Sequence, residues 1–120
     1  MPYVALIPSD EGAWAALPDA ERRDAYARYA TVADEMRSAG VLLGGDELAS
    51  SQAATTVRVR GGDTLVTDGP YAEVKEALGG YFLLECGSLD EALGWAAKIP
   101  GAAYGAVEVR PVHVEREEAS

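Results

Sequence analysis

The sequence predicts an α+β fold: a ferredoxin-like α+β sandwich in which two main helices lie on one face of an antiparallel sheet. Three observations predict it: short apolar segments alternate with two segments of helical periodicity, each of these follows a strand-like segment, and glycine or proline separates most of them. At 120 residues and 48% hydrophobic composition, the chain can form one core. We therefore expect a single domain over residues 1–114 and a polar tail over residues 115–120.

The N-terminal third is predicted to be a strand followed by a long helix. Residues 3–7 form a short, partly β-branched apolar segment that ends at Pro8, as expected for a strand covered on both faces. Between Pro18 and Ala39 apolar side chains recur every three or four residues, which predicts an amphipathic helix. Pro18 suits its first turn, and Gly40 suits the left-handed position after its last turn.

The middle of the chain is predicted to contain three strands. Residues 41–43 begin a strand that Gly44 and Gly45 interrupt, which indicates a short or bulged strand. Residues 55–60 alternate valine with polar side chains, and a double glycine then turns the chain into residues 64–67. This pattern predicts a β-hairpin.

The C-terminal third is predicted to supply a central strand, the second helix and a last strand. Residues 81–86 are apolar on both faces, which favours a central position in the sheet. Ser88, with a glutamate three residues later, has the capping-box form and begins a helix that we expect to end at Pro100. Residues 106–114 alternate as the final strand. Because two helices cannot cover all the apolar surface of such a sheet, its open face is predicted to pack against a second copy.

Composition excludes several classes of function. Twenty acidic and ten basic residues give a formal charge of −10, which repels phosphate backbones and argues against nucleic-acid binding. The pair Arg22 and Arg23 is interpreted as solvated charge. No apolar stretch approaches the ~20 residues that span a bilayer, and the N-terminus lacks signal-peptide features, so we expect a cytoplasmic protein without a membrane partner. The single cysteine, Cys86, lies in an apolar strand, which favours a buried, unreactive thiol.

The segment over residues 67–80 is the most informative part of the chain, because it combines a turn, four charged side chains and a double glycine. Its Asp-Gly-Pro sequence at residues 68–70 is a strong turn signal directly after a strand. The proline also suits the start of a short helix over residues 71–78, which the double glycine that follows would end. On such a helix Glu73 and Glu76 share one face.

Two interpretations of these carboxylates stay open. In the first, Asp68, Glu73 and Glu76 converge at the strand end, where repulsion raises one pKa and produces a general acid or base, or where they hold Mg²⁺. In the second, Asp68 caps the turn, and the glutamates are solvated or paired with Lys75 or Arg58. The sequence shows no Cys/His spacing for zinc, and we expect no metal and no cofactor.

A few other side chains have both a functional and a structural interpretation. His113 is the only histidine, and a lone histidine without a partner in the sequence specifies no mechanism. Trp14 and Trp95 either stack on a ligand or complete the packing. Glu108 and Arg110 either form a cross-strand ion pair or line a pocket or dimer seam. Motifs for nucleotide binding and serine hydrolysis are absent from the sequence.

The segment over residues 67–80 resembles the signature of the YCII-related, or DGPF, family of small bacterial proteins. The usual motif is Asp-Gly-Pro-Phe followed by Ala-Glu-Thr-Lys-Glu, and here Tyr71 replaces the Phe and Val74 the Thr. Similar segments occur in the same order across nearly the whole chain, at residues 11–17, 39–42, 88–97 and 105–111. The resemblance implies a dimeric α/β barrel of ferredoxin-like topology and genetic association with extracytoplasmic-function sigma factors.

The resemblance also directs attention to particular residues. Some relatives carry a His and Asp pair proposed as catalytic, with the His on the first long helix, but in this chain that region holds Tyr26 and Tyr29. A His-based mechanism therefore does not transfer. The family motif places any chemistry on residues of the charged segment, with three further pocket partners elsewhere: Asp68, Glu73, Lys75 and Glu76, together with Arg58, Tyr29 and Arg110.

Three functional hypotheses follow. The first is a homodimeric module that binds a small polar molecule or a protein partner, linked to sigma-factor regulation. The second is a cofactor-independent hydrolase or proton-transfer enzyme, in which Asp68 is the general base and Lys75 or Arg58 stabilises an oxyanion. The third is a structural dimerisation module, in which no concave pocket adjoins Asp68.

Overall fold

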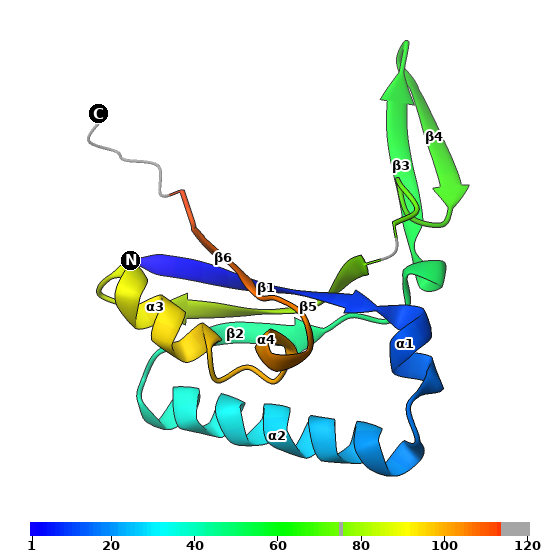
Figure 1. Ribbon diagram of the computed structural model, residues 1–120. Coiled ribbons are helices and arrows are strands. Elements are labelled where there is room, and N and C mark those ends of the chain that lie inside the picture. Colours follow the sequence, from blue (N-terminus) through cyan, green and yellow to red (C-terminus); the bar gives the residue numbers. More distant parts are fainter. Residues whose placement is uncertain (75, 114–120) are drawn as a thin grey trace, which may run out of the picture.

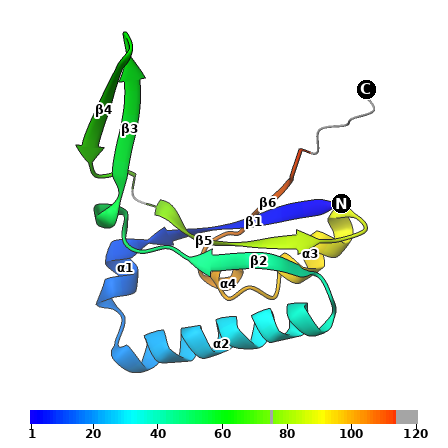
Figure 2. The same ribbon diagram turned by 180° about the vertical axis from the view of Figure 1, so that it is seen from behind.

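The computed structural model describes residues 1–74 and 76–113, and its centre is a four-stranded antiparallel sheet (Figure 1). The strands run in the order β2-β5-β1-β6 and are β1 (Pro2–Asp10), β2 (Leu42–Glu47), β5 (Glu76–Glu85) and β6 (Glu108–Pro111). The long helix α2 (Asp19–Ser38) and α3 (Leu89–Ala96) lie on the same face of this sheet, as Figures 1 and 2 show from opposite sides. The predicted ferredoxin-like α+β sandwich is confirmed.

Strand β1 shows how the sheet separates a buried face from an open face. Tyr3 and Ala5 are buried and pack with Val32 and Met36 of α2 in the main core. Because successive side chains alternate between the faces of a strand, Val4 and Leu6 lie on the other face. They pair with Leu83 and Tyr81 of β5, respectively. We call these four half-buried residues, Val4, Leu6, Tyr81 and Leu83, the open-face stripe.

Both predicted helices exist, and their ends follow from local chemistry. Pro18 is the N-cap of α2, and Gly40 has φ of 76°, the left-handed conformation expected after the last turn. The Ser88 hydroxyl accepts the Glu91 backbone N–H at 3.1 Å and so begins α3. This helix ends at Ala96, earlier than predicted, and a separate helical turn α4 (Gly101–Tyr104) follows Pro100.

The chain also forms two short helices that the sequence analysis did not predict. Helix α1 (Glu11–Ala16) begins where the Asp10 carboxylate accepts the Ala13 backbone N–H at 3.0 Å. A 3₁₀ turn (Ser51–Ala53) follows β2. Strand β2 has a register shift between Leu42 and Gly44, so the predicted bulge is confirmed.

The predicted hairpin consists of β3 (Thr55–Arg60) and β4 (Asp63–Asp68), joined by two glycines with φ of 58° and 86°. It does not join the main sheet. It forms a separate two-stranded sheet that rises from one end of the molecule, on the side away from α2 (Figures 1 and 2). We call residues 55–68 the arm.

The helix predicted over residues 71–78 is wrong. Residues 71–74 are turn and coil, and β5 begins at Glu76. The reason is tertiary: the backbone from Glu76 onwards pairs with β1, which leaves too few residues after the proline to nucleate a helix. Gly79 and Gly80 therefore do not end a helix but lie inside β5. A Cβ atom on Gly79 would lie 2.8 Å from the Cβ of Ser9, so the close approach of β1 requires the glycine.

The remaining predictions concern the ends of the chain and Cys86. Strand β6 is shorter than the predicted 106–114, and the predicted tail over 115–120 lies outside the described residues.

Cys86 is buried in the core, and this burial raises the pKa of its thiol, in agreement with an unreactive role. In the part of the chain that the structure describes, no helix has the length and apolar character needed to cross a membrane.

Candidate functional site

A cleft of about 1450 Å³ opens between the N-terminal half of α2 and the end of the sheet where β1 ends and β5 begins. Helices α1 and α4 and the end of β2 also contribute to its lining. Part of the floor is Phe82, which pairs with Ala5 and therefore points to the helix face of the sheet. The cleft is thus built at the seam between the sheet and its covering helices.

Aromatic rings form much of the cleft wall. Trp14 of α1 and Tyr26 of α2 meet edge to face, with ring centroids 5.4 Å apart and an interplanar angle of 88°. Tyr29 lies one turn further along α2, and Tyr104 lines the cleft from α4. These side chains give the cleft a concave surface with several aromatic rings, a kind of surface that holds small organic molecules.

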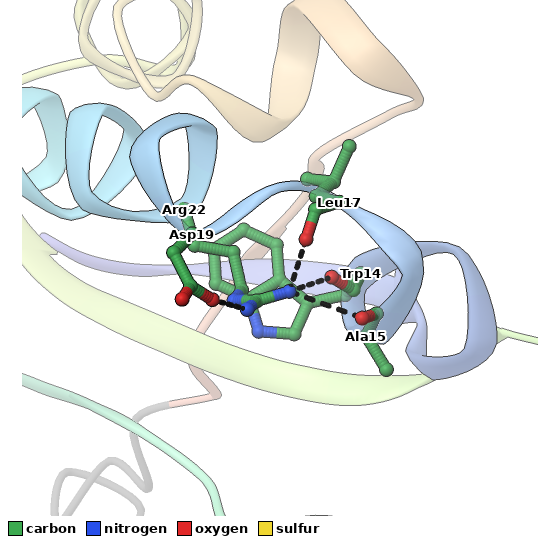
Figure 3. Close-up of polar contacts among 5 residues, drawn as sticks. All are labelled: Trp14, Ala15, Leu17, Asp19 and Arg22. Atoms are coloured by element: carbon green, nitrogen blue, oxygen red, sulfur yellow. Dashed lines mark hydrogen bonds and ion pairs between the residues drawn. The ribbon is translucent and has the colours of Figure 1, made fainter.

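Arg22 fixes the wall that carries Trp14 (Figure 3). Its guanidinium donates hydrogen bonds to the carbonyl oxygens of Trp14 at 3.3 Å and Ala15 at 3.0 Å, and also to that of Leu17. The same side chain pairs with Asp19. The last carbonyls of a helix have no partner within the helix, so Arg22 satisfies the C-terminal end of α1. With only 26% of its side chain exposed, it is not the solvated charge that the sequence analysis predicted.

Hydrogen bonds of two tyrosines connect α2 to the end of β2 and to α4 across the cleft. The Tyr26 hydroxyl donates to a Glu47 carboxylate oxygen at 2.9 Å, and this bond raises the pKa of Tyr26. Tyr29 is half-buried, and burial raises the pKa of its hydroxyl, partly offset by a hydrogen bond with the Gly101 backbone. Both phenols therefore stay protonated at neutral pH and present O–H groups to the cleft.

Glu11 closes one end of the cleft. Its carboxylate accepts the Ser51 backbone N–H at 2.8 Å and the Ser51 hydroxyl at 2.7 Å. These bonds lower the pKa of Glu11, because they favour its charged form. The contact holds the segment after β2 against the first turn of α1.

The charge of the lining is strongly negative. The only basic residue among the described residues of the lining is Arg28, which pairs with Asp24 at 3.1 Å and donates a hydrogen bond to Tyr104. The same lining holds seven carboxylates. They come from β1, both N-terminal helices, β2 and β5: Asp10, Glu11, Glu21, Asp24, Asp46, Glu47 and Glu76.

Of the predicted site residues that the structure describes, two line this cleft, Tyr29 and Glu76. Asp68 is the last residue of β4, exposed at the base of the arm, and it is not part of the lining. The turn after it is tied to the arm: the Gly69 N–H donates to the Ala54 carbonyl at 2.7 Å, and the Gly69 carbonyl accepts the Thr56 hydroxyl at 2.7 Å. Gly69 has φ of 100°, which explains the glycine at this position.

The other predicted site residues lie apart from the cleft. Arg58 is on the arm, where it donates a long 3.5 Å hydrogen bond to the Tyr71 carbonyl. Glu73 is exposed in the coil before β5. Arg110 is exposed on β6, 3.8 Å from the Glu108 carboxylate, and Lys75 lies outside the described residues. The structure thus brings Tyr29 and Glu76 to one site and leaves Asp68, Glu73, Arg58 and Arg110 outside it.

The two tryptophans lie in different parts of the molecule, and the described carboxylates do not form a metal-binding cluster. Trp14 lines the cleft, whereas Trp95 packs against the core and lies 5.1 Å below the Lys98 ammonium group. Among residues 1–74 and 76–113, no three His, Cys, Asp or Glu side chains gather closely enough to hold a metal ion. The predicted convergence of Asp68, Glu73 and Glu76 depended on the helix over residues 71–78, which does not form.

Sequence reasoning named Tyr29 and gave Trp14 a ligand-stacking alternative, but it assigned no site role to Tyr26 or Glu47, which also line the cleft. Tyr26 and Tyr29 are three residues apart on one helix, and this spacing was a signal for a shared face. Glu47 and Trp14 carry no comparable local signal. They reach the cleft because α1 and the end of β2 meet at the same end of the sheet, which only the tertiary fold determines.

Comparisons with known proteins agree with this fold. The chain is 38% identical over 114 residues to an uncharacterized protein of Rhizobium meliloti (strain 1021), a match that covers 93% of this chain and 92% of that protein. The structure of this chain is similar to that of 5-chloro-2-hydroxyhydroquinone dehydrochlorinase (TftG) from Burkholderia phenoliruptrix, solved in complex with 2,5-dihydroxybenzoquinone. This similarity has a TM-score of 0.54 at 14% identity and covers 94% of each chain, so it concerns the fold. The model of the YCII-related domain matches residues 1–116, and the chain therefore belongs to the YCII-related domain family.

Proposed function

We propose that the protein is a homodimeric binding module whose cleft holds a small molecule with an aromatic body and a positively charged amine. The observation that carries this proposal is the lining of the cleft, where aromatic rings stand beside seven carboxylates and a single arginine. Aromatic faces attract cations, and a concave surface of one charge sign concentrates ligands of the opposite sign. Because the carboxylates do not gather at one point, they favour an organic cation over a bare metal ion.

Tyr26 and Glu47 are the central pair of this proposal. Their hydrogen bond links α2 to the sheet and leaves the Glu47 carboxylate at the cleft. An ammonium group that enters would find this carboxylate next to the Tyr26 and Trp14 rings. The amine is thus expected to make a charge-assisted hydrogen bond with Glu47 while the ligand ring packs on the aromatic wall.

The test uses a matched set of probes: tyramine, 4-ethylphenol and 4-hydroxyphenylacetate, which share a phenol and differ in charge. We expect tyramine to bind best in calorimetry and to raise the melting temperature most. Glu47→Gln should weaken tyramine binding by about tenfold, since a charge-assisted hydrogen bond contributes more than a neutral one. Glu108→Gln on β6 removes the same charge outside the cleft and is the control. Equal or tighter binding of the carboxylate probe would overturn the proposal.

The homodimer in this proposal uses the open face of the sheet. The open-face stripe is uncharged and half-buried within the single chain, and no helix lies on that side of the sheet in Figures 1 and 2. Burial of this apolar face against a second copy follows the usual behaviour of half-covered sheets. Leu83→Lys should therefore shift the protein from dimer to monomer in sedimentation equilibrium, and a wild-type monomer would overturn the dimer.

A regulatory link to an extracytoplasmic-function sigma factor stays a prediction from the family resemblance, and with it a cytoplasmic location. The negative charge of the chain favours a protein or small-molecule partner over DNA. Binding of the purified protein to a purified sigma factor from the same genome, with and without tyramine, tests the link. Failure to bind at micromolar concentration would remove this part of the proposal and leave the cleft untouched.

A second candidate function is a cofactor-independent hydrolase or proton-transfer enzyme with Asp68 as the general base. One observation favours an enzyme: the similar structure at 14% identity is named a dehydrochlorinase. Because Asp68 is outside the cleft lining, this mechanism requires a substrate held at the base of the arm. The test is turnover of chlorinated hydroquinones by wild type, Asp68→Asn and Glu76→Gln. Activity that survives Asp68→Asn would exclude Asp68 as the base.

A further inference from the structure

Exposed apolar side chains are concentrated in one part of the molecule. Of the fourteen large hydrophobic side chains that are exposed among the described residues, seven lie between residues 57 and 78. Four belong to the arm, and Tyr71, Val74 and Leu78 belong to the segment that leads from the arm into β5. Exposed apolar side chains that share one face mark a surface that binds another molecule.

The arm has one apolar face. Val57 lies directly opposite Val66, and Val59 is two residues along the same strand, so the three side chains share a face. Their exposed fractions are 60%, 64% and 59%. The opposite face carries Arg58 opposite Leu65. We call Val57, Val59 and Val66 the valine face.

The arm makes few contacts with the rest of its own chain. Within the described residues, β3 and β4 make extensive contacts only with each other, and the hydrogen bonds of Gly69 hold the base of the arm. A two-stranded hairpin without a covering surface is marginally stable in water. The valine face therefore needs a surface that the described residues of its own chain do not supply.

We infer that the valine face of each arm packs on the open-face stripe of a second copy of this chain, so that each arm clasps its partner in a twofold dimer. This inference rests on the dimer of the proposed function and adds the arm to its interface. The arm rises on the side of the sheet away from α2, which is the side of the open-face stripe (Figures 1 and 2). A second copy that covers the stripe therefore lies alongside the arm.

Symmetry and charge favour a second copy as the occupant. Each chain supplies one valine face and one open-face stripe, so a twofold dimer buries both surfaces of both copies. Two copies that each carry a charge of −10 repel one another except where their surfaces lack charge. The stripe is uncharged, and the valine side of the arm carries a single charged residue, Asp68 at its base, because Arg58, Arg60 and Asp63 lie on the opposite side. These are the surfaces on which two acidic copies meet at the lowest electrostatic cost.

The dimer also gives the charged segment over residues 67–80 a structural role. The turn at residues 68–70 sets the direction in which the arm leaves the body, through the φ of 100° at Gly69 and its hydrogen bonds to Ala54 and Thr56. Tyr71 and Val74, exposed beside it, then extend the apolar interface. In this arrangement the motif directs the arm toward the partner.

The test is the dimer dissociation constant of the full chain, measured by sedimentation equilibrium. The double variant Val57→Lys/Val66→Lys should raise it by at least about 100-fold, because two interface side chains become buried charges. Leu65→Lys places the same charge on the opposite face of the same arm, and we expect a change of less than about threefold. Equal weakening by Leu65→Lys and by the valine variants would contradict the assignment of the interface to the valine face.

A second measurement avoids substitutions that unfold the arm. In hydrogen exchange of the wild type, amides of β3 and β4 should exchange more slowly above the dimer dissociation constant than below it. A double variant that dimerises as tightly as wild type, with arm exchange independent of concentration, would overturn the arm inference and leave the sheet-face dimer intact. A wild type that stays monomeric would overturn both.

Discussion

Strand β5 and the arm strands are neighbours in the chain and lie in opposite environments. β5 lies between β1 and β2, and Leu84 near its C-terminal end is fully buried. The arm has regular pairing from Thr55 to Asp68, yet every residue of β4 is exposed. Both regions have the alternation and turn chemistry of strands, so these local signals specify pairing and do not specify what covers the strand. The body obtains its cover from α2 and α3, whereas no helix or strand in the described part of the chain covers the arm.

The largest expected effect on stability is at Leu84 in β5. Its dependence on protein concentration should differ from that of a substitution in the arm. Leu84→Ala should lower the free energy of unfolding by about 2–5 kcal/mol, because it opens a cavity in the core. Since the core lies within one chain, this loss should be the same at every protein concentration. Val66→Ala removes a side chain that is 64% exposed, so its effect should be within about 0.5 kcal/mol at concentrations that favour the monomer.

Chemical denaturation at low and high protein concentration measures this difference. If the arm packs on a second copy, the cost of Val66→Ala should grow with concentration as the dimer forms. A concentration-dependent cost at Leu84, or a large constant cost at Val66, would remove the distinction between a self-covered body and an uncovered arm.

The next effect concerns how closely the strands of the body approach. Gly79→Ala should lower the free energy of unfolding by about 1–3 kcal/mol, because the new Cβ would lie 2.8 Å from the Cβ of Ser9. Gly94→Ala is the matched control: it lies in α3 with no atom within 4 Å of its new Cβ, and alanine favours helix by about 0.5–1 kcal/mol. Thermal denaturation should therefore shift in opposite directions for the two variants. A shift in the same direction would show that β1 and β5 are not packed this closely at Gly79.

A smaller effect tests the wall of the cleft. Arg22→Ala should lower the free energy of unfolding by about 1–2 kcal/mol, because it removes the donor that the carbonyls of Trp14 and Ala15 share at the end of α1. Trp14 should then lose its fixed contact with Tyr26, which a change in tryptophan fluorescence would report. Arg23→Ala is the control, since Arg23 is exposed beside it. Unchanged fluorescence in Arg22→Ala would contradict a positioning role for Arg22.

The sequence predicted the elements of the body well because their patterns are local. The helix between Pro18 and Gly40 and the capping by Ser88 depend on residues within a few positions of each other. The helix over residues 71–78 failed because pairing of β5 with β1 joins residues far apart in the chain, and this pairing overrides local propensity. The candidate site stays a prediction, and it divides in the same way: Tyr29, which the family resemblance indicated, lines the cleft, whereas Glu47 joins it only through the fold.

The smallest effect is expected at Glu11, where a carboxylate ties α1 to the segment after β2. Its pKa is lowered in the folded protein by hydrogen bonds from Ser51, so its contribution to stability is complete above the ordinary carboxyl pKa of 4.5 and is lost as the pH falls through the lower folded-state value. Glu11→Gln should therefore lower the melting temperature slightly at pH 7. It should make no difference at a pH below the folded-state pKa of Glu11, where the carboxyl group is protonated. Melting temperatures measured from pH 3 to pH 7 for both proteins give the comparison. Because the arm has no such tie to α1, exchange of its amides should not respond to this variant, and a response there would show that the arm and the cleft are coupled.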